Sequence, residues 1–182
     1  MANYWQKRAY AELSTEPSDL AKRGLVYLLA RFFTVPQTAS VSFALTTNGV
    51  EVEFQFYDLS TQQEPILAEL IEAPSAATKF GSLIPGRNLN RNFSDDHTVE
   101  LQAASGISGG TVIASELIGS EKGAGATSSD KVHTLTNEAT YIMTFYNSGN
   151  QNTLCHINLG WAENDPEHYN LVTEGINTPG VT

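Results

Sequence analysis

Three neighbouring residues, Asp95, Asp96 and His97, have side chains that could bind a metal ion or exchange a proton. Carboxylates beside an imidazole suit both kinds of chemistry, provided that the groups point at one spot. Successive side chains of an extended chain point to opposite faces, so these three are not expected to converge. Aspartates are also common at turns. We therefore predict a solvated turn at this position.

A second candidate is the pair Cys155 and His156, which has the residue types of a nucleophile and its base. Such a pair must be in contact to react, whereas adjacent residues of a strand point apart. We predict that one of the two lies in the core and the other on the surface. The four histidines, at positions 97, 133, 156 and 168, also lack the spacing that places two metal ligands on one helix face. The sequence therefore predicts no catalytic residue, no metal site and no cofactor.

Residues 119–127 contain several glycines and Lys122, as do loops that bind phosphate. The segment lacks the Gly-Lys-Ser/Thr ending of such loops, and no helical pattern follows it. We predict a flexible loop over residues 119–130 between two strands.

Aromatic and basic residues gather near the N-terminus, where Tyr4, Trp5 and Tyr10 accompany Lys7 and Arg8. Large rings and arginine are favoured at the centres of protein interfaces. These residues either form an interface or pack on their own domain. We take Tyr4, Trp5, Arg8 and Tyr10 as candidate interface residues.

The chain has 182 residues, of which 41% are hydrophobic and only 16% are charged. This length suits one domain with a sizeable core. The low share of charged residues argues against a helix-rich protein with a surface of Glu and Lys pairs, and favours strands and turns. A single cysteine excludes an internal disulfide and zinc sites built from cysteine pairs.

The formal net charge is -10, so the phosphates of a nucleic acid would be repelled, and we expect no nucleic-acid partner. Five of the ten basic residues nevertheless lie within the first 31 positions. We expect this N-terminal segment to meet an acidic surface, such as that of a neighbouring copy.

The longest apolar run, residues 24–35, is shorter than the roughly 18 residues of a membrane-spanning helix and contains Arg31. Residues 1–8 do not read as a signal peptide, because no apolar stretch follows their charges. We expect no membrane partner. Periodicity allows residues 24–35 to be a buried strand or a short helix, and the β-branched and aromatic content with the closing Pro36 favours the strand.

Residues 39–46 and 50–57 are predicted to form a hairpin, because Asn48 and Gly49 suit the positive φ angles of a tight turn. In the second run the apolar residues at even positions alternate with polar ones, so one face meets the core and the other meets water. Further strands are predicted over residues 65–71, 97–103, 111–118, 131–135, 139–146 and 154–161.

Residues 73–94 are rich in Pro, Gly, Ser and Asn and are predicted to run over the surface without regular structure. Eight or nine short strands without a credible long helix predict a mainly β protein, an antiparallel β-sandwich or jelly roll. We expect an N-terminal arm (residues 1–23), a β-sandwich domain (24–163) and a C-terminal tail (164–182).

Five motifs in the second half carry a family resemblance. They are Asn88-Leu89-Asn90-Arg91-Asn92, Gly109-Gly110-Thr111-Val112-Ile113, Leu135-Thr136-Asn137-Glu138-Ala139-Thr140-Tyr141, Phe145-Tyr146-Asn147-Ser148-Gly149 and Leu159-Gly160-Trp161-Ala162-Glu163. In this order, over residues 40–163, they resemble a family of small structural proteins of tailed-bacteriophage virions, which serve in head decoration, fibres or tails. The resemblance implies a particle subunit without catalysis.

We expect a capsid decoration protein that binds the assembled head through its arm and loop surfaces, is located in the virion and is assembled in the host cytoplasm. The expected partners are the major capsid protein or another virion protein, and further copies of this chain in a homo-oligomer, with a trimer as the expected state. Two alternatives remain: a neck or tail subunit, and a carbohydrate-binding module in which Trp161, Tyr141 or the Asn-rich turn holds a sugar. An enzyme comes last.

Three of the motif residues have two physical interpretations. Arg91 is a further candidate interface residue, because its guanidinium can hold either its own loop or a neighbouring molecule. Tyr141 and Trp161, on late strands, are predicted to be core residues rather than platforms for a ligand.

Overall fold

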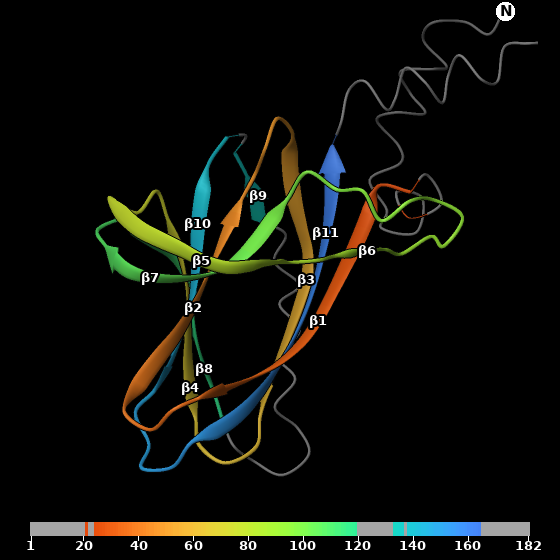
Figure 1. The fold of residues 1–182 in the computed structure, drawn as a ribbon. Coiled ribbons are helices and arrows are strands. Elements are labelled where there is room, and N and C mark those ends of the chain that lie inside the picture. The colour runs from red at the N-terminus through yellow and green to blue at the C-terminus, as the bar shows by residue number, and fades with distance from the viewer. Residues whose placement is uncertain (1–20, 22–23, 120–132, 137, 165–182) are drawn as a thin grey trace, which may run out of the picture.

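The computed structural model describes Ala21 and residues 24–119, 133–136 and 138–164 (Figure 1). The predicted loop at residues 119–130, apart from Gly119, lies outside these residues, as do nearly all of the predicted arm and tail. Over the described ranges, no helix is long and apolar enough to cross a membrane.

Eleven β-strands lie within the described residues. They are β1 (Val26–Val35), β2 (Ala39–Thr46), β3 (Glu51–Thr61), β4 (Ile66–Glu72), β5 (Ala76–Ile84), β6 (Arg87–Asn88), β7 (Glu100–Ser108), β8 (Thr111–Ile118), β9 (His133–Leu135), β10 (Thr140–Asn147) and β11 (Thr153–Asn164). One sheet has the order β6-β1-β11-β3-β9 and the other the order β5-β7-β2-β10-β4-β8, with antiparallel pairing. The two sheets face each other (Figure 1), which confirms the predicted β-sandwich.

The predicted hairpin between β2 and β3 is wrong, because these strands belong to different sheets. Gly49 has a φ of 84°, but Asn48 does not have the positive φ that a type I′ turn also requires. Instead, Asn48 Nδ2 donates a hydrogen bond to the Thr98 carbonyl over 3.0 Å. The alternation in β3 specified which face is buried, and the buried Val50, Val52 and Phe54 confirm it. It carried no information about the neighbouring strand.

Among the described strands, no two that are consecutive in sequence pair with each other. β1 pairs with β11, from Val26 opposite Ala162 to Val35 opposite Thr153, and β10 pairs with both β2 and β4. Most of the connections therefore cross from one sheet to the other. Such a topology is dominated by contacts between distant parts of the chain, which is typical of slowly folding proteins.

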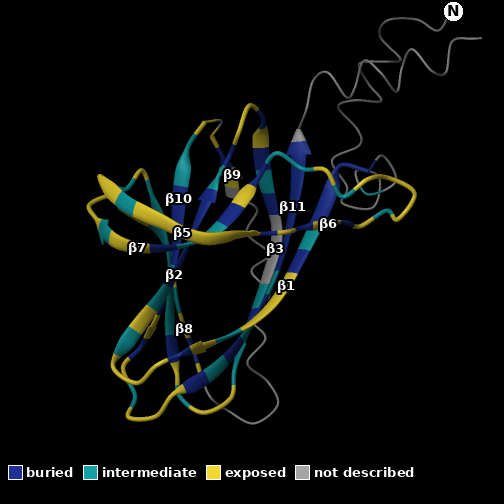
Figure 2. Ribbon diagram, in the orientation of Figure 1, coloured by how far each residue is buried: buried dark blue, intermediate teal, exposed yellow. Residues whose placement is uncertain are grey.

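The expectation that residues 73–94 lack regular structure is also wrong, because they contain β5 and β6. β5 is exposed along most of its length and only its last residue, Ile84, is buried (Figure 2). It therefore lacks the apolar alternation by which strands are recognised, and its pairing with β7 holds it in the sheet. The other predicted strands are present with small shifts at their ends.

The core lies between the sheets, where inward side chains of both meet. Phe33, Phe43 and Phe145 form an aromatic group with ring centroids 5.0 to 6.1 Å apart, in tilted or edge-on orientations. Leu59 of β3 and Leu45 of β2 are almost completely buried, at 0% and 1% exposure. Burial of apolar surface of this extent is the main stabilising term of the fold.

Core and surface positions should respond differently to the same truncation. Leu59→Ala should lower the free energy of unfolding by about 2 to 5 kcal/mol, because it removes buried contacts and leaves a cavity. Leu117→Ala, at a side chain that is 70% exposed, should change it by less than about 0.5 kcal/mol. Urea unfolding followed by circular dichroism measures both, and similar losses would contradict this assignment of the core.

Candidate functional site

Asn88 anchors the loop of residues 89–99, which joins β6 to β7 and carries most of the polar residues that the sequence singled out. The side chain is buried, and its Nδ2 donates to the Gly24 carbonyl over 2.8 Å. Its Oδ1 accepts the Asn90 N–H at 2.9 Å, and Asn90 Oδ1 accepts the Asn92 N–H at 3.1 Å. Asparagine turns of this kind shape a loop through contacts with its own backbone.

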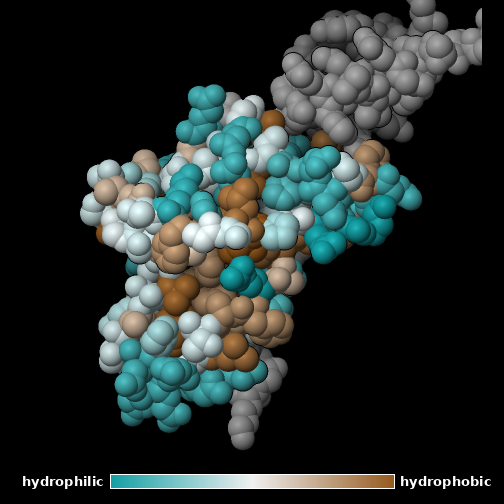
Figure 3. Space-filling view, viewed as in Figure 1, coloured by the Kyte–Doolittle hydropathy of each residue, from teal (hydrophilic) through white to brown (hydrophobic). Residues whose placement is uncertain are grey.

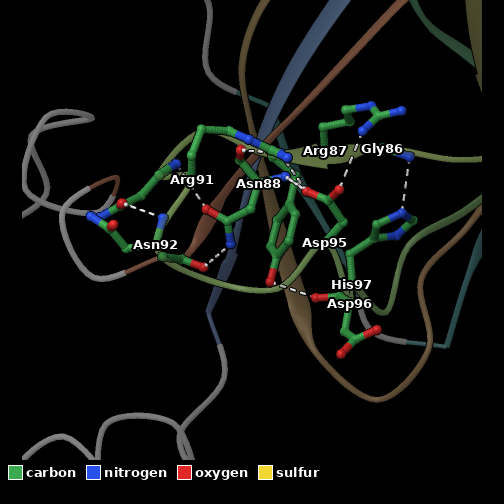
Figure 4. Close-up of polar contacts among 11 residues, drawn as sticks. Gly86, Arg87, Asn88, Arg91, Asn92, Asp95, Asp96 and His97 are labelled. Carbon is green, nitrogen blue, oxygen red and sulfur yellow. Dashed lines mark hydrogen bonds and ion pairs between the residues drawn. The ribbon is translucent and has the colours of Figure 1, made fainter.

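Asp95 holds the two sides of this loop together (Figure 4). Its Oδ1 accepts the Asn88 N–H and a hydrogen bond from Arg91 Nη1, each over 2.8 Å, and Arg87 lies 3.6 Å from Oδ2. The backbone hydrogen bond from Asn88, together with the nearby Arg91, lowers the pKa of Asp95 below its ordinary value. These contacts thus favour the charged form of the Asp95 carboxyl in the folded protein.

His97 lies beneath the loop, between the rings of Tyr27 and Trp161, with centroid distances of 5.6 and 5.5 Å. Its Nε2 accepts the Gly86 N–H over 3.0 Å, and its Nδ1 lies 2.7 Å from the Val99 carbonyl (Figure 4). Since Nε2 accepts, Nδ1 must carry the proton that it donates to Val99. Both nitrogens are occupied by the backbone, so this imidazole is a structural group.

The three adjacent residues do not converge, as predicted. Asp95 faces the arginines, His97 faces Gly86, and Asp96 contributes its carbonyl oxygen to the hydroxyl of Tyr27 at 2.7 Å (Figure 4). Within the part of the chain that the structure describes, no three His, Cys, Asp or Glu side chains are grouped to hold a metal ion. The expectation of a merely solvated turn needs correction, because Asp95 and His97 fasten the turn to the sandwich.

Glu163 is a buried carboxylate that the sequence analysis did not single out. It is 5% exposed, and its Oε1 accepts the N–H groups of Thr98 at 2.9 Å, Val99 at 3.1 Å and Trp161 Nε1 at 3.2 Å. A buried carboxylate with several donors is well satisfied. Glu163, the last residue of the closing motif, therefore joins the end of β11 to the end of the loop at Thr98 and Val99.

Cys155 and His156 point to opposite faces of β11, as predicted. Cys155 is fully buried, and burial raises the pKa of its thiol to about 12. His156 packs on the outer face against Phe32, with ring centroids 4.4 Å apart. The thiol is therefore protonated at neutral pH and has no base beside it in this strand.

The other two motif residues, Tyr141 and Trp161, are core residues, as predicted, at 1% and 2% exposure. The Tyr141 hydroxyl accepts the Thr136 N–H at 2.9 Å and donates to Glu72 Oε1 at 3.1 Å. Neither ring is available as a platform for a sugar.

Hollows in the described part of the chain include one between the sheets and one at the surface. The first is an apolar cavity of about 50 Å³ between the sheets, near Phe54, Leu70 and Met143, with room for a few water molecules. The second is an open hollow of about 400 Å³ near Leu83 and Pro85, and also includes His97 and Thr98. The buried Thr98 hydroxyl at this hollow has no hydrogen-bond partner. The two ring nitrogens of His97, the other polar group named here, both form hydrogen bonds with the backbone.

Of the five candidate interface residues, the structure describes only Arg91. Its side chain is 65% exposed, although its Nη1 is 2.8 Å from Asp95. Arg91 holds its own loop and still presents surface to a neighbour. Tyr4, Trp5, Arg8 and Tyr10 lie outside the described residues.

The lowered pKa of Asp95 predicts a contribution to stability that depends on acid. Because the folded pKa lies below the unfolded one, the contribution is fully present above about pH 4 and is lost as the pH falls through the folded pKa. Asp95→Asn should lower the melting temperature near pH 7, and its difference from wild type should shrink below about pH 4. Asp96→Asn, at the neighbouring exposed carboxylate, is the matched control and should leave the melting temperature close to that of wild type. A constant difference for Asp95→Asn would contradict the assignment.

Replacing the buried carboxylate should loosen the loop. In Glu163→Gln the amide oxygen can replace Oε1, but the NH₂ replaces Oε2 and faces the Thr98 N–H, and the negative charge that the N–H groups of Thr98, Val99 and Trp161 stabilise is lost. We expect a loss of about 1 to 3 kcal/mol in urea unfolding and faster hydrogen exchange at the Thr98 and Val99 amides. Glu51→Gln, at an exposed position of β3, should have neither effect. Unchanged exchange at both amides would rule out this role.

Comparison of the chain with protein families, with curated proteins and with solved structures found no match. A function therefore has to be inferred from the residues of this chain and tested on the protein itself.

Proposed function

We propose that this chain is a non-enzymatic structural subunit of a tailed-phage virion, and specifically a capsid decoration protein that binds the assembled head. The observation that carries the proposal is the set of large apolar side chains that the sandwich leaves exposed. They are Phe32, Phe80, Leu83, Leu89, Phe93, Val112, Leu117 and Tyr146. Apolar side chains gathered on a surface are typical of sites that bind another protein.

Several of these side chains are neighbours on the outer face of the six-stranded sheet. Tyr146 lies opposite Leu67 in the pairing of β10 with β4, and Leu67 lies opposite Leu117 in the pairing of β4 with β8. Directly paired residues point to the same face, so the three form an apolar row, in which Tyr146 is 43% and Leu117 is 70% exposed. A flat apolar row at a sheet edge suits a protein partner.

Apolar side chains are exposed elsewhere as well: Phe32, on the outer face of the five-stranded sheet, is 66% exposed. Figure 3 shows apolar side chains gathered in the middle of its view, below β5, with hydrophilic side chains at the upper loops and the lower end. An apolar centre with a polar rim is the usual composition of a protein interface. Exposure on more than one side suits a subunit that contacts both a lattice and further copies of itself.

The polar side chains support a structural role. The buried Glu163, the imidazole of His97 and the carboxylate of Asp95 are each engaged in holding loop 89–99. The motif order of the family resemblance supports the same class of function. The proposed partners are the major capsid protein or another virion protein, and further copies of this chain, with a trimer as the expected oligomer.

A neck or tail subunit would have the same chemistry and a different partner, so we separate the two by stoichiometry. Quantitative mass spectrometry of purified particles should find this protein at parity with the major capsid protein, or at a simple fraction of it. A ring-sized number would move it to the neck or tail and overturn the decoration role. Absence from particles would overturn the virion function.

A further inference from the structure

The outer face of the five-stranded sheet is covered at one end. Val26 and Ala162 are paired there, and both are buried although they point away from the core. Ala21 and Leu25 pack against them. The chain that follows the N-terminal segment therefore enters the fold on this outer face.

Further along this face, we call the outward side chains of residues 30–34 in β1, with their partners in β11 and β3, the β1 face. Phe32 is 66% exposed, and its ring lies against His156, which is paired with it across the strands. The next row consists of Ala30, Asn158 and Asp58. An exposed phenyl ring over an imidazole, beside small side chains, is a surface on which another aromatic ring can pack.

The β1 face borders on acidic groups. Asp58 lies in its second row, and Glu51 is an exposed residue of the same strand, β3. Arg31 of β1 is exposed but lies on the inward side of this sheet, 5.9 Å from the Phe43 ring, and Arg87 of β6 faces Asp95 at 3.6 Å. A partner for this face should therefore combine aromatic rings with positive charge.

The first ten residues of the chain have that composition. Tyr4, Trp5 and Tyr10 supply three rings, and Lys7 and Arg8 supply two positive charges, with no Asp or Glu among residues 1–10. Arginine binds carboxylates through paired hydrogen bonds, and tryptophan and tyrosine are favoured at interface centres. The segment thus complements the β1 face in both charge and ring content.

Chain length allows the segment to reach the face of a second copy. Arg8 precedes Ala21 by thirteen residues, which span at most about 43 Å. Phe32 is six residues from Val26 along β1, or about 20 Å. The segment is therefore long enough for the β1 face of an adjacent subunit, and the homo-oligomer of the proposed function supplies such a neighbour.

We propose that residues 4–10 of one copy dock on the β1 face of a neighbouring copy, with the rings on Phe32 and His156, the basic side chains near Asp58, and the more distant Glu51 adding to the negative charge of the same side of the sheet. This docking rests on the homo-oligomer of the proposed function and describes the contact between its subunits. Each copy docks its own segment on a neighbour and accepts the segment of another copy. Heterologous contacts of this kind close into a ring when the rotation between subunits allows it.

Sedimentation equilibrium of the intact chain tests the charge pairing. The wild type should self-associate, and the double variant Glu51→Lys/Asp58→Lys should dissociate with a constant raised by about tenfold or more. Adding Lys7→Glu/Arg8→Glu to that variant should restore association. The control Glu69→Lys, on the outer face of the other sheet, should associate like wild type. A monomeric wild type, or no restoration by the charge swap, would overturn the proposal.

Disulfide trapping distinguishes a neighbouring copy from the same chain. We would mix intact Trp5→Cys and Phe32→Cys chains, so that a heterodimer can form only between copies; the native Cys155 is buried and should stay silent. The expected product is a covalent heterodimer, with far less from Trp5→Cys mixed with Ser115→Cys, at an exposed position on the outer face of the other sheet. Equal heterodimer yields from the two mixtures would overturn the proposal. It would also be overturned if a disulfide formed only within a single chain that carries both Trp5→Cys and Phe32→Cys. These measurements use purified protein, so their failure is distinct from absence of the protein from particles.

Discussion

The inward face of β11 is the constraint on which the rest of this structure depends. β11 lies between β1 and β3, and alternate residues from Cys155 to Trp161 point into the core and are buried. The same alternation turns Glu163 inward at the end of the strand, where a carboxylate must find donors. It finds them at Thr98 and Val99, and this requirement sets the path of the loop that leads into β7.

The polar groups with the most reactive chemistry are thereby engaged in structure. His97 donates and accepts hydrogen bonds with the backbone, and Asp95 joins the two sides of its loop. The Cys155 thiol is completely buried in the core. The exposed surface has the opposite character, with rings and aliphatic side chains on the outside of both sheets. This division suits a protein that acts by binding other subunits, and the proposed function and the proposed contact between copies both follow from it.

Pairing between distant strands has consequences for assembly as well. None of the described strands pairs with its neighbour in sequence, so the sheets can form only after much of the chain is present. The free side of β1 is open for much of its length, because β6 pairs only with Tyr27 and Leu28. Arg31, at an inward position of this edge strand, lies 5.9 Å from the Phe43 ring and discourages pairing with a foreign strand.

The sequence by itself determined the fold class, the strands with clear apolar alternation, and the divergence of Asp95, Asp96 and His97, because these follow from local periodicity and strand geometry. It could not reveal β5, whose exposed side chains carry no pattern, nor the partners of β2 and β3, because alternation specifies a face and leaves the neighbour open. Only the tertiary structure decided that Glu163 is buried and that His97 is fastened to Gly86. Glu163 accepts the N–H of Thr98, 65 residues away in sequence, and His97 accepts the N–H of Gly86, 11 residues away. These groups come close only after the sheets have packed.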